Sequence, residues 1–285
     1  MNCLHFIDEG KEIYVDSFFM KTDNEGMEKE LFIKQLRQGI YLLDEAHEST
    51  GYLVIGKNKA CLIDTMNGYT NLKEVVSKLT DRELLVVNTH GHPDHIFGNV
   101  FFDEVYMNPS DYELAATFTD NPEFNKEGLH FPPYKPIQEG DILELGGRNL
   151  EIYNLPGHTR GGILLLLKEE RLLFTGDSIN HHLWMQLDGC PPMEELVKNL
   201  DRIMFLEKEA DFILHGHARD FDDISLLPCM RQGALEIAQG KTGEDEDYHW
   251  FGGIGKQHHF KLNPDKHYSQ LHSVICYTPK ENDKS

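Results

Sequence analysis

The sequence predicts an α/β protein in which two β-sheets pack together and carry helices on their outer faces. Short apolar or β-branched runs, which are typical of strands, occupy the first part of the chain and are followed by an amphipathic helical pattern. A second group of strand-like runs begins after residue 140 and is again followed by helical patterns. No internal repeat or coiled-coil heptad competes with this interpretation.

The first half of the chain predicts strands at 40–43, 52–55, 60–63, 83–88 and 105–107, and helices at 72–79 and 109–117. The helix at 72–79 is indicated by apolar residues spaced i, i+3, i+4 and i+7. The continuous apolar run at 84–87 suits a strand that is buried on both faces. Residues 118–139 are rich in Pro, Asn, Asp and Gly, so we expect an irregular insertion there.

The second half predicts strands at 142–145, 150–154, 163–168, 171–175, 212–214 and 273–277, and helices at 193–206 and 223–239. Pro228 falls inside the last helix, where we expect a kink. We expect residues 1–240 to form one domain and residues 241–285 to form a C-terminal tail packed on that same domain.

The charge of the chain excludes several classes of partner. Its 27 Lys and Arg residues against 48 Asp and Glu residues give a formal net charge of −21, which disfavours nucleic acid and anionic lipid. No stretch approaches the roughly 18 apolar residues of a membrane span. The five cysteines never form a CxxC pair and are typical of reduced thiols, so we expect a cytoplasmic protein. The strongly anionic surface does little to attract polyanions, so we expect a small-molecule substrate. The oligomeric state is left open.

A cluster of metal-binding residue types follows the predicted strand at 83–88. His90 and His92 alternate along an extended chain, so both imidazoles can face one ion. Pro93 then bends the chain, and Asp94 and His95 can face a second point nearby. Imidazole and carboxylate are common ligands of borderline divalent metals, so this segment predicts a metal site.

Further candidate ligands follow later predicted strands. His158 lies on a tight turn, Asp177 ends a strand-like run, and His215 and His217 flank Gly216 after another. Loops at strand ends are where chemistry is usually placed. Too many candidates exist for one tetrahedral ion, and they suit two ions a few ångströms apart, bridged by a carboxylate and a hydroxide.

The chain clearly resembles the metallo-β-lactamase superfamily over about residues 38–220. The motifs that carry the resemblance are, in order, Leu62-Ile63-Asp64-Thr65, Thr89–His95, Pro156-Gly157-His158-Thr159, Thr175-Gly176-Asp177 and Gly216-His217. The resemblance implies an αββα sandwich of two mixed β-sheets, with the metals at one edge of the sheets. It also favours His217 over His215, because the last ligand of the family follows a glycine.

The resemblance implies a role for each matching residue. One metal would be held by His90, His92 and His158, and the other by Asp94, His95 and His217. Asp177 would bridge the two ions, and Asp64 would orient a ligand histidine without binding metal. We expect two divalent ions, with zinc favoured and iron or manganese as alternatives.

The expected reaction is hydrolysis by a metal-bridging hydroxide, with Asp94 orienting the nucleophile or moving its proton. Asp177 stands where β-lactamases of the family carry Cys or Ser, and it resembles the thioesterases, lactonases and phosphodiesterases instead. Asn180 departs from the tyrosine usual in lactonases, and Ala218-Arg219 departs from the Glu-Tyr of glyoxalase II. With Asp at position 177 we expect a small ester, thioester or lactone as substrate, and these departures leave the choice among the three open.

Two alternatives stay open beside this interpretation: a phosphodiesterase of the same fold, and an oxidoreductase similar to the mononuclear iron persulfide dioxygenases. Candidates for the substrate pocket, or for holding the ligands in place, follow Asp177 closely; they are His181, His182 and Trp184.

Overall fold

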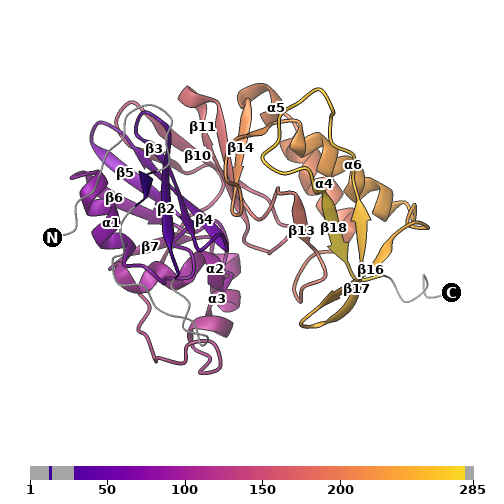
Figure 1. The fold of residues 1–285 in the computed structure, drawn as a ribbon, viewed down its shortest axis with the longest axis horizontal. Helices are drawn as coiled ribbons and strands as arrows, with labels where there is room; N and C mark the ends of the chain where they lie inside the picture. Colours follow the sequence, from indigo (N-terminus) through magenta and orange to yellow (C-terminus); the bar gives the residue numbers. More distant parts are fainter. Residues whose placement is uncertain (1–12, 15–28, 280–285) are drawn as a thin grey trace. The chain divides into compact units, whose positions relative to one another are not determined.

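The structure, a computed structural model, describes residues 13–14 and 29–279. It divides the chain into two compact units, residues 1–152 and 153–285. Strands and helices are mixed in both units (Figure 1), which confirms the expected α/β class. Within the described ranges, every helix is too short or too polar to cross a membrane.

The first unit is built on a sheet in which each strand pairs with the next one in the sequence. Its strands are β1 (Ile13–Tyr14), β2 (Leu31–Arg37), β3 (Ile40–Glu45), β4 (Ser49–Ile55), β5 (Lys59–Ile63), β6 (Glu83–Val87), β7 (Val105–Met107) and β8 (Tyr134–Pro136). Pairing is antiparallel from β1 to β5 and parallel from β5 to β8, so the sheet is mixed. The parallel part places the carboxyl ends of β5 and β6 at the same edge.

Helix α1 (Leu72–Leu79) confirms the helix predicted from apolar spacing. Its first turn is capped by Asn71, whose side chain accepts a hydrogen bond from the backbone N–H of Glu74. Leu72, Val75 and Val76 are buried in the same cluster as residues of β4 and β5. Each such side chain contributes about 1.5–3 kcal/mol on burial, so this face fixes the helix on the sheet.

The rest of the first unit consists of short elements. They are α2 (Pro93–Ile96), the 3₁₀ turns η1 (Phe97–Phe101) and η2 (Pro109–Asp111), α3 (Tyr112–Thr119) and the antiparallel hairpin of β9 (Ile142–Glu144) and β10 (Asn149–Asn154). The helix expected at 109–117 therefore begins as a 3₁₀ turn and continues to Thr119. The segment expected to be irregular contains the short strand β8.

In the second unit, strands β11 (Ile163–Leu167), β12 (Leu172–Gly176), β14 (Phe212–His215) and β15 (Asp222–Asp223) lie side by side in the order β15-β14-β12-β11. The turn η3 (Lys168–Glu170) joins β11 to β12. Helices α4 (Met193–Ile203) and α5 (Leu206–Glu209) separate β12 from β14, which pairs with it in parallel. Every residue of β11 and β12 is buried, as the apolar runs predict.

A smaller sheet completes the second unit. Its strands are β13 (His182–Trp184), β16 (Glu246–Trp250), β17 (Gly253–His259) and β18 (Val274–Tyr277), in the order β13-β18-β17-β16. Strand β18 matches the predicted strand at 273–277, whereas β16 and β17 were not predicted. Part of the expected tail thus pairs with β13, and the domain boundary expected at residue 240 stays a prediction.

Helix α6 (Leu226–Ala238) packs against this smaller sheet (Figure 1). It begins three residues later than expected, which places Pro228 in its first turn. Backbone N–H groups in the first turn of a helix have no helical partner, so a proline there removes no hydrogen bond. The expected kink assumed that Pro228 lies in the interior of the helix. That assumption was wrong, because Pro228 is the third residue of α6.

Candidate metal centre

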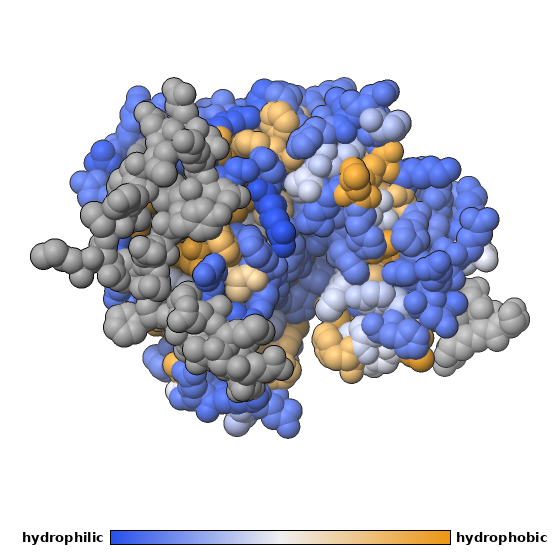
Figure 2. Space-filling model, in the orientation of Figure 1, coloured by the Kyte–Doolittle hydropathy of each residue, from blue (hydrophilic) through white to orange (hydrophobic). Residues whose placement is uncertain are grey.

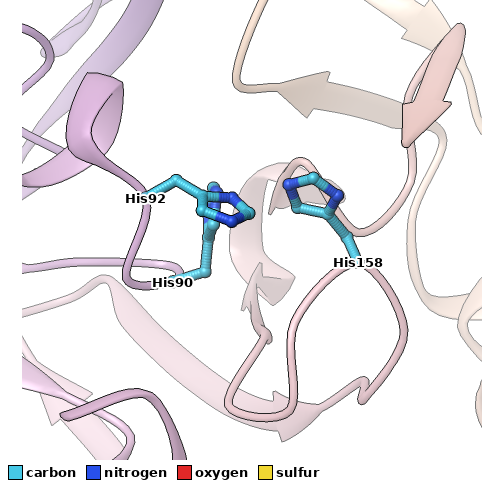
Figure 3. A group of neighbouring side chains, drawn as sticks. All are labelled: His90, His92 and His158. Carbon is cyan, nitrogen blue, oxygen red and sulfur yellow. The ribbon is translucent and has the colours of Figure 1, made fainter. Parts of the chain in front are cut away.

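The loop after β6 presents the first candidate ligands. His90 and His92 both project from this loop (Figure 3), and their ring centroids lie 4.9 Å apart in an edge-on arrangement. A hydrogen bond holds the loop between these two histidines, because the backbone N–H of Gly91 donates to Oδ2 of the buried Asp111 at 3.0 Å. The alternation expected from an extended chain thus places both imidazoles close together.

Helix α2 presents the second pair. Pro93 occupies its first position, and the helix carries Asp94 and His95 directly after it. Oδ2 of Asp94 lies 3.4 Å from Nε2 of His95, and the ring centroids of His95 and His90 are 4.1 Å apart. The four candidate residues of the first unit therefore gather at one point.

Asp64 holds this group in place from the end of β5. Its carboxylate accepts hydrogen bonds from the backbone N–H of Thr89 at 2.7 Å and from the Thr89 hydroxyl at 2.8 Å. The same carboxylate lies 2.9 Å from Nδ1 of His95, and both residues are buried. A carboxylate at Nδ1 keeps the proton on that nitrogen and leaves Nε2 as the lone-pair donor, which is how ligand histidines are oriented in metal sites.

In the second unit, His158 lies on a tight turn that is closed by a hydrogen bond from the Leu155 N–H to the Gly162 carbonyl. Its imidazole rises from this turn (Figure 3). Nδ1 of His158 lies 2.7 Å from the backbone carbonyl of Trp184, an acceptor, so Nδ1 donates and Nε2 again carries the lone pair. This Nε2 lies 3.8 Å from Oδ2 of Asp177.

Asp177 and His217 follow β12 and β14, whose parallel pairing brings their carboxyl ends to one edge. Nε2 of His217 lies 3.0 Å from Oδ2 of Asp177. His215 instead accepts a hydrogen bond at Nδ1 from the backbone N–H of His217, and its Nε2 lies 3.3 Å from Asp222. His217 thus lies beside Asp177 and His215 beside Asp222, and the preference for His217 as a ligand stays a prediction.

His215 belongs to a second, fully buried cluster with His181 and Asp222. Asp222 lies 3.0 Å from Nε2 of His181 and accepts hydrogen bonds from the backbone and hydroxyl of Ser269. Burial opposes the charged form of Asp222, but hydrogen bonds from the two histidines outweigh it, so the pKa of this carboxyl is held well below its usual range. Asp222 was missed, because its position in Phe-Asp-Asp carries no spacing signal.

His182 and Trp184, the other expected pocket residues, lie on β13. Burial, helped by the neighbouring His272, lowers the pKa of His182 to about 4, so the imidazole is neutral at physiological pH. Its Nε2 lies 3.2 Å from Sγ of Cys276 on β18. Trp184 contributes its carbonyl to His158 and its side chain to a ring cluster on the same sheet.

The donor set of each unit fits a divalent metal by its chemistry. Imidazole nitrogens and carboxylate oxygens are the ligands that zinc and similar ions take. His95 and His158 have Nδ1 held by an acceptor, so each offers Nε2. Ligand atoms at about 2.0–2.1 Å from a tetrahedral ion are about 3.3 Å apart. The donor separations within the units, from 3.0 to 3.8 Å, bracket that value.

Comparison with known proteins gives consistent matches. The model of the metallo-beta-lactamase superfamily matches residues 46–217. An acyl-coenzyme A thioesterase, MBLAC2 of Gallus gallus, is 31% identical over 223 residues, which cover 66% of this chain and 80% of that protein. A hydroxyacylglutathione hydrolase of Francisella tularensis is 25% identical, and the match covers 49% of this chain and 50% of that protein.

Solved structures match the fold. The DIM-1 metallo-beta-lactamase superposes with a TM-score of 0.56 at 22% identity, and the match covers 73% of this chain and 98% of that one. A metallo-beta-lactamase family protein of Thermus thermophilus gives a TM-score of 0.51 at 21% identity, covering 73% and 81%. These likenesses establish the fold class that the sequence predicts.

Proposed function

Because this chain belongs to the metallo-β-lactamase superfamily, we propose that it is a metal-dependent hydrolase that cleaves a thioester. The observation that carries the proposal is the complete set of histidine and aspartate donors, in which His95 and His158 are each held at Nδ1 so that Nε2 is offered to a metal. Relatives named as an acyl-coenzyme A thioesterase and a hydroxyacylglutathione hydrolase support the thioester as the substrate class.

We propose that His90, His92 and His158 would hold one ion, that Asp94, His95 and His217 would hold a second, and that Asp177 would be shared by both. The bridging role is supported by the position of Asp177, whose Oδ2 lies near Nε2 of both His158 and His217. Zinc is the preferred metal because imidazole dominates the donor set, and iron and manganese are the alternatives to test.

Two such ions would supply an activated water and a Lewis acid for the substrate carbonyl. The chain's own residues supply positioning and proton transfer. The side chain of Asp94 is 32% exposed, unlike the fully buried His95 beside it, so a carboxylate oxygen can accept a proton from the attacking water. The oxygen of this water forms a bond to the thioester carbonyl carbon, and collapse of the tetrahedral adduct breaks the C–S bond. Asp94 returns the first proton to the departing thiolate, and the carboxylic acid product releases the second to solvent, so the products are a carboxylate, a thiol and a proton.

The remaining expectations agree with this assignment. A net charge of −21 argues against nucleic acid as a partner, so we propose a small-molecule substrate. Among the described residues, Cys61, Cys190, Cys229 and Cys276 are free thiols, which suits the reducing cytoplasm that we propose as the compartment. We also propose that residues 241–285 belong to the same functional domain as residues 1–240, because β16, β17 and β18 extend the sheet that begins at β13.

The test is a substrate panel on protein whose metal content is measured in the same preparation. We expect about two ions per chain and release of free thiol from acyl thioesters, detected with a thiol reagent. The panel includes a lactone, a chromogenic phosphodiester and, with oxygen uptake recorded, a persulfide. Thiol release that is absent from metal-loaded protein would refute the proposal, and one iron per chain with oxygen uptake would replace it with a dioxygenase.

A further inference from the structure

The small sheet of the second unit has two faces of different character. Leu183 of β13 and Ile275 of β18 are cross-strand partners, and both are buried in the core that includes residues of α6. Neighbouring residues of a strand point to opposite faces. His182 and Trp184 therefore lie on the other face, as does Cys276, the partner of Trp184. We call this second surface the outer face.

Aromatic side chains gather on the outer face around Trp184. Its ring centroid lies 6.3 Å from that of Tyr248, 6.4 Å from that of Trp250 and 6.1 Å from that of Phe251. Trp250 and Phe251 are themselves 4.7 Å apart, and Phe251 is 86% exposed. Figure 2 shows orange and pale atoms at the free end of the β16–β17 hairpin, amid largely hydrophilic surface. A cluster of aromatic rings that reaches solvent at Phe251 is typical of a binding site.

The hairpin sequence makes room for these rings. Trp250 pairs across the hairpin with Gly253, and Tyr248 pairs with Gly255, so the cross-strand positions on the outer face carry no side chain. The indole of Trp250 lies directly over Gly252, where an added Cβ would come within 2.2 Å of the ring. Because these glycines carry no side chains, the aromatic rings have room to lie over the sheet and to contact a ligand from solvent.

The outer face is tied to the candidate metal centre through one residue. The backbone carbonyl of Trp184 accepts the hydrogen bond from Nδ1 of His158, while the indole of Trp184 forms the middle of the ring cluster. His182, next to these rings, is neutral because its pKa is about 4. Trp184, which orients His158, is therefore also part of an uncharged aromatic surface. Such a surface suits an apolar group of a substrate better than a charged one.

We propose that Trp184, Tyr248, Trp250 and Phe251 bind the apolar acyl group of the substrate and set its preferred chain length. The proposal rests on the proposed function for the identity of the substrate as a thioester. The binding of an alkyl chain to these four side chains does not depend on hydrolysis, because it rests on the transfer of apolar groups from water. Each fully buried methylene raises the affinity about fourfold. On a surface that covers the chain from one side, we expect about twofold per methylene.

The experiment uses the only two tryptophans of the chain, Trp184 and Trp250, as the probe, since both lie in the cluster. Intrinsic fluorescence is titrated with non-hydrolysable S-alkyl thioethers of N-acetylcysteamine, from butyl to decyl, below their micelle concentrations. We expect a saturable change whose Kd falls about twofold per methylene. Phe251→Ser, at an exposed position, should flatten this dependence and raise KM for a decanoyl thioester about tenfold, relative to an acetyl thioester.

Ile254→Ser is the matched control. Ile254 lies in the same hairpin and is 64% exposed, but it pairs with His249 and so points to the opposite face from Tyr248 and Trp250. This variant should keep the wild-type chain-length dependence in both binding and hydrolysis. An equal effect of Ile254→Ser and Phe251→Ser would overturn the assignment to the outer face.

The outcomes separate this proposal from the proposed function. Chain-length-dependent fluorescence without any thioester hydrolysis would refute the function and leave the apolar binding face standing. Hydrolysis with a Kd and KM independent of chain length would refute the binding face and leave the function standing. If Phe251→Ser instead changes a dimer to a monomer in light scattering, without altering the Kd of the alkyl series, the face is an interface between copies and the proposal is wrong.

Discussion

Replacing Asp64 by asparagine is a sharp test of how the candidate metal centre is organised. In the native protein one carboxylate oxygen of Asp64 accepts the backbone N–H of Thr89, and the other faces both the Thr89 hydroxyl and Nδ1 of His95. The asparagine carbonyl must keep the backbone contact, because an amide N–H cannot face another N–H donor. Its NH₂ group then faces Nδ1 of His95.

This exchange changes the tautomer of His95. An NH₂ group opposite Nδ1 requires an unprotonated Nδ1, so the proton moves to Nε2, the nitrogen that is expected to bind metal. Loss of a partner behind a ligand histidine typically lowers metal affinity by about 10- to 100-fold. That factor corresponds to about 1.4–2.7 kcal/mol of binding free energy. Exchanging the charged carboxylate for a neutral amide also weakens the hydrogen bonds that it makes, which destabilises the metal-free fold by about 1 kcal/mol.

The assay is competition for zinc between the metal-free protein and a chromogenic chelator, with urea unfolding of the same samples. Asp44→Asn is the control, because Asp44 is also buried and also faces Nδ1 of a histidine, but that histidine is His47, which is not a candidate ligand. Its zinc affinity should therefore stay within about twofold of wild type. The reasoning fails if Asp64→Asn binds zinc at the weaker site as tightly as Asp44→Asn does.

Three further predictions follow from the structure. Asp177→Ala should release one of two metals and lower thioester hydrolysis by about 100-fold or more, since it removes a bridge rather than a supporting residue; metal analysis showing two retained ions would contradict the bridge. Burial raises the pKa of Glu45 to about 7 from 4.5, so the fold disfavours its charged form and the protein loses stability as pH rises from about 4.5 to 7. At about 1.4 kcal/mol per pH unit, Glu45→Gln should be more stable than wild type by about 3 kcal/mol above pH 7 and equally stable below pH 4.5. Urea unfolding at pH 5 and pH 8 measures this difference in unfolding free energy, and the same difference at both pH values would count against the prediction. Gly56→Ala should cost about 1–3 kcal/mol in unfolding free energy, because its Cβ would lie 2.1 Å from the Leu145 carbonyl oxygen; an unchanged denaturation midpoint would show that this approach is looser than the structure has it.

The strands and helices that local pattern specifies were predicted well. The apolar spacing of α1 and the buried run of β11 each identify their element within a few residues. The β16–β17 hairpin was missed, because its sequence is rich in charged residues, glycine and histidine and carries no apolar alternation. Its strands form through pairing with β18, which in turn pairs with β13 some 90 residues earlier in the chain. A long-range pairing of this kind leaves no signal in a short window of sequence.

The candidate ligands show the same division. His90, His92, Asp94 and His95 are close together in the sequence, so strand geometry and one proline are enough to predict that they lie together. The choice between His215 and His217 depends on which way each imidazole turns. Asp222, on a later strand, lies 3.3 Å from Nε2 of His215, a contact that no local pattern predicts. The preference for His217 itself stays a prediction. The assignment of metals to these residues stays a prediction for the experiments above.

The sequence by itself determined the α/β class, the family and the chemical nature of the donors, because strand periodicity and closely spaced histidines are local properties of the chain. Tertiary structure decided the tautomer of each anchored histidine, through Asp64 behind His95 and the Trp184 carbonyl behind His158. It also decided that the aromatic residues of the C-terminal segment share one face with Trp184. These contacts join residues between 26 and 66 positions apart, and hydrogen-bond geometry at such separations depends on the folded backbone, not on the local pattern.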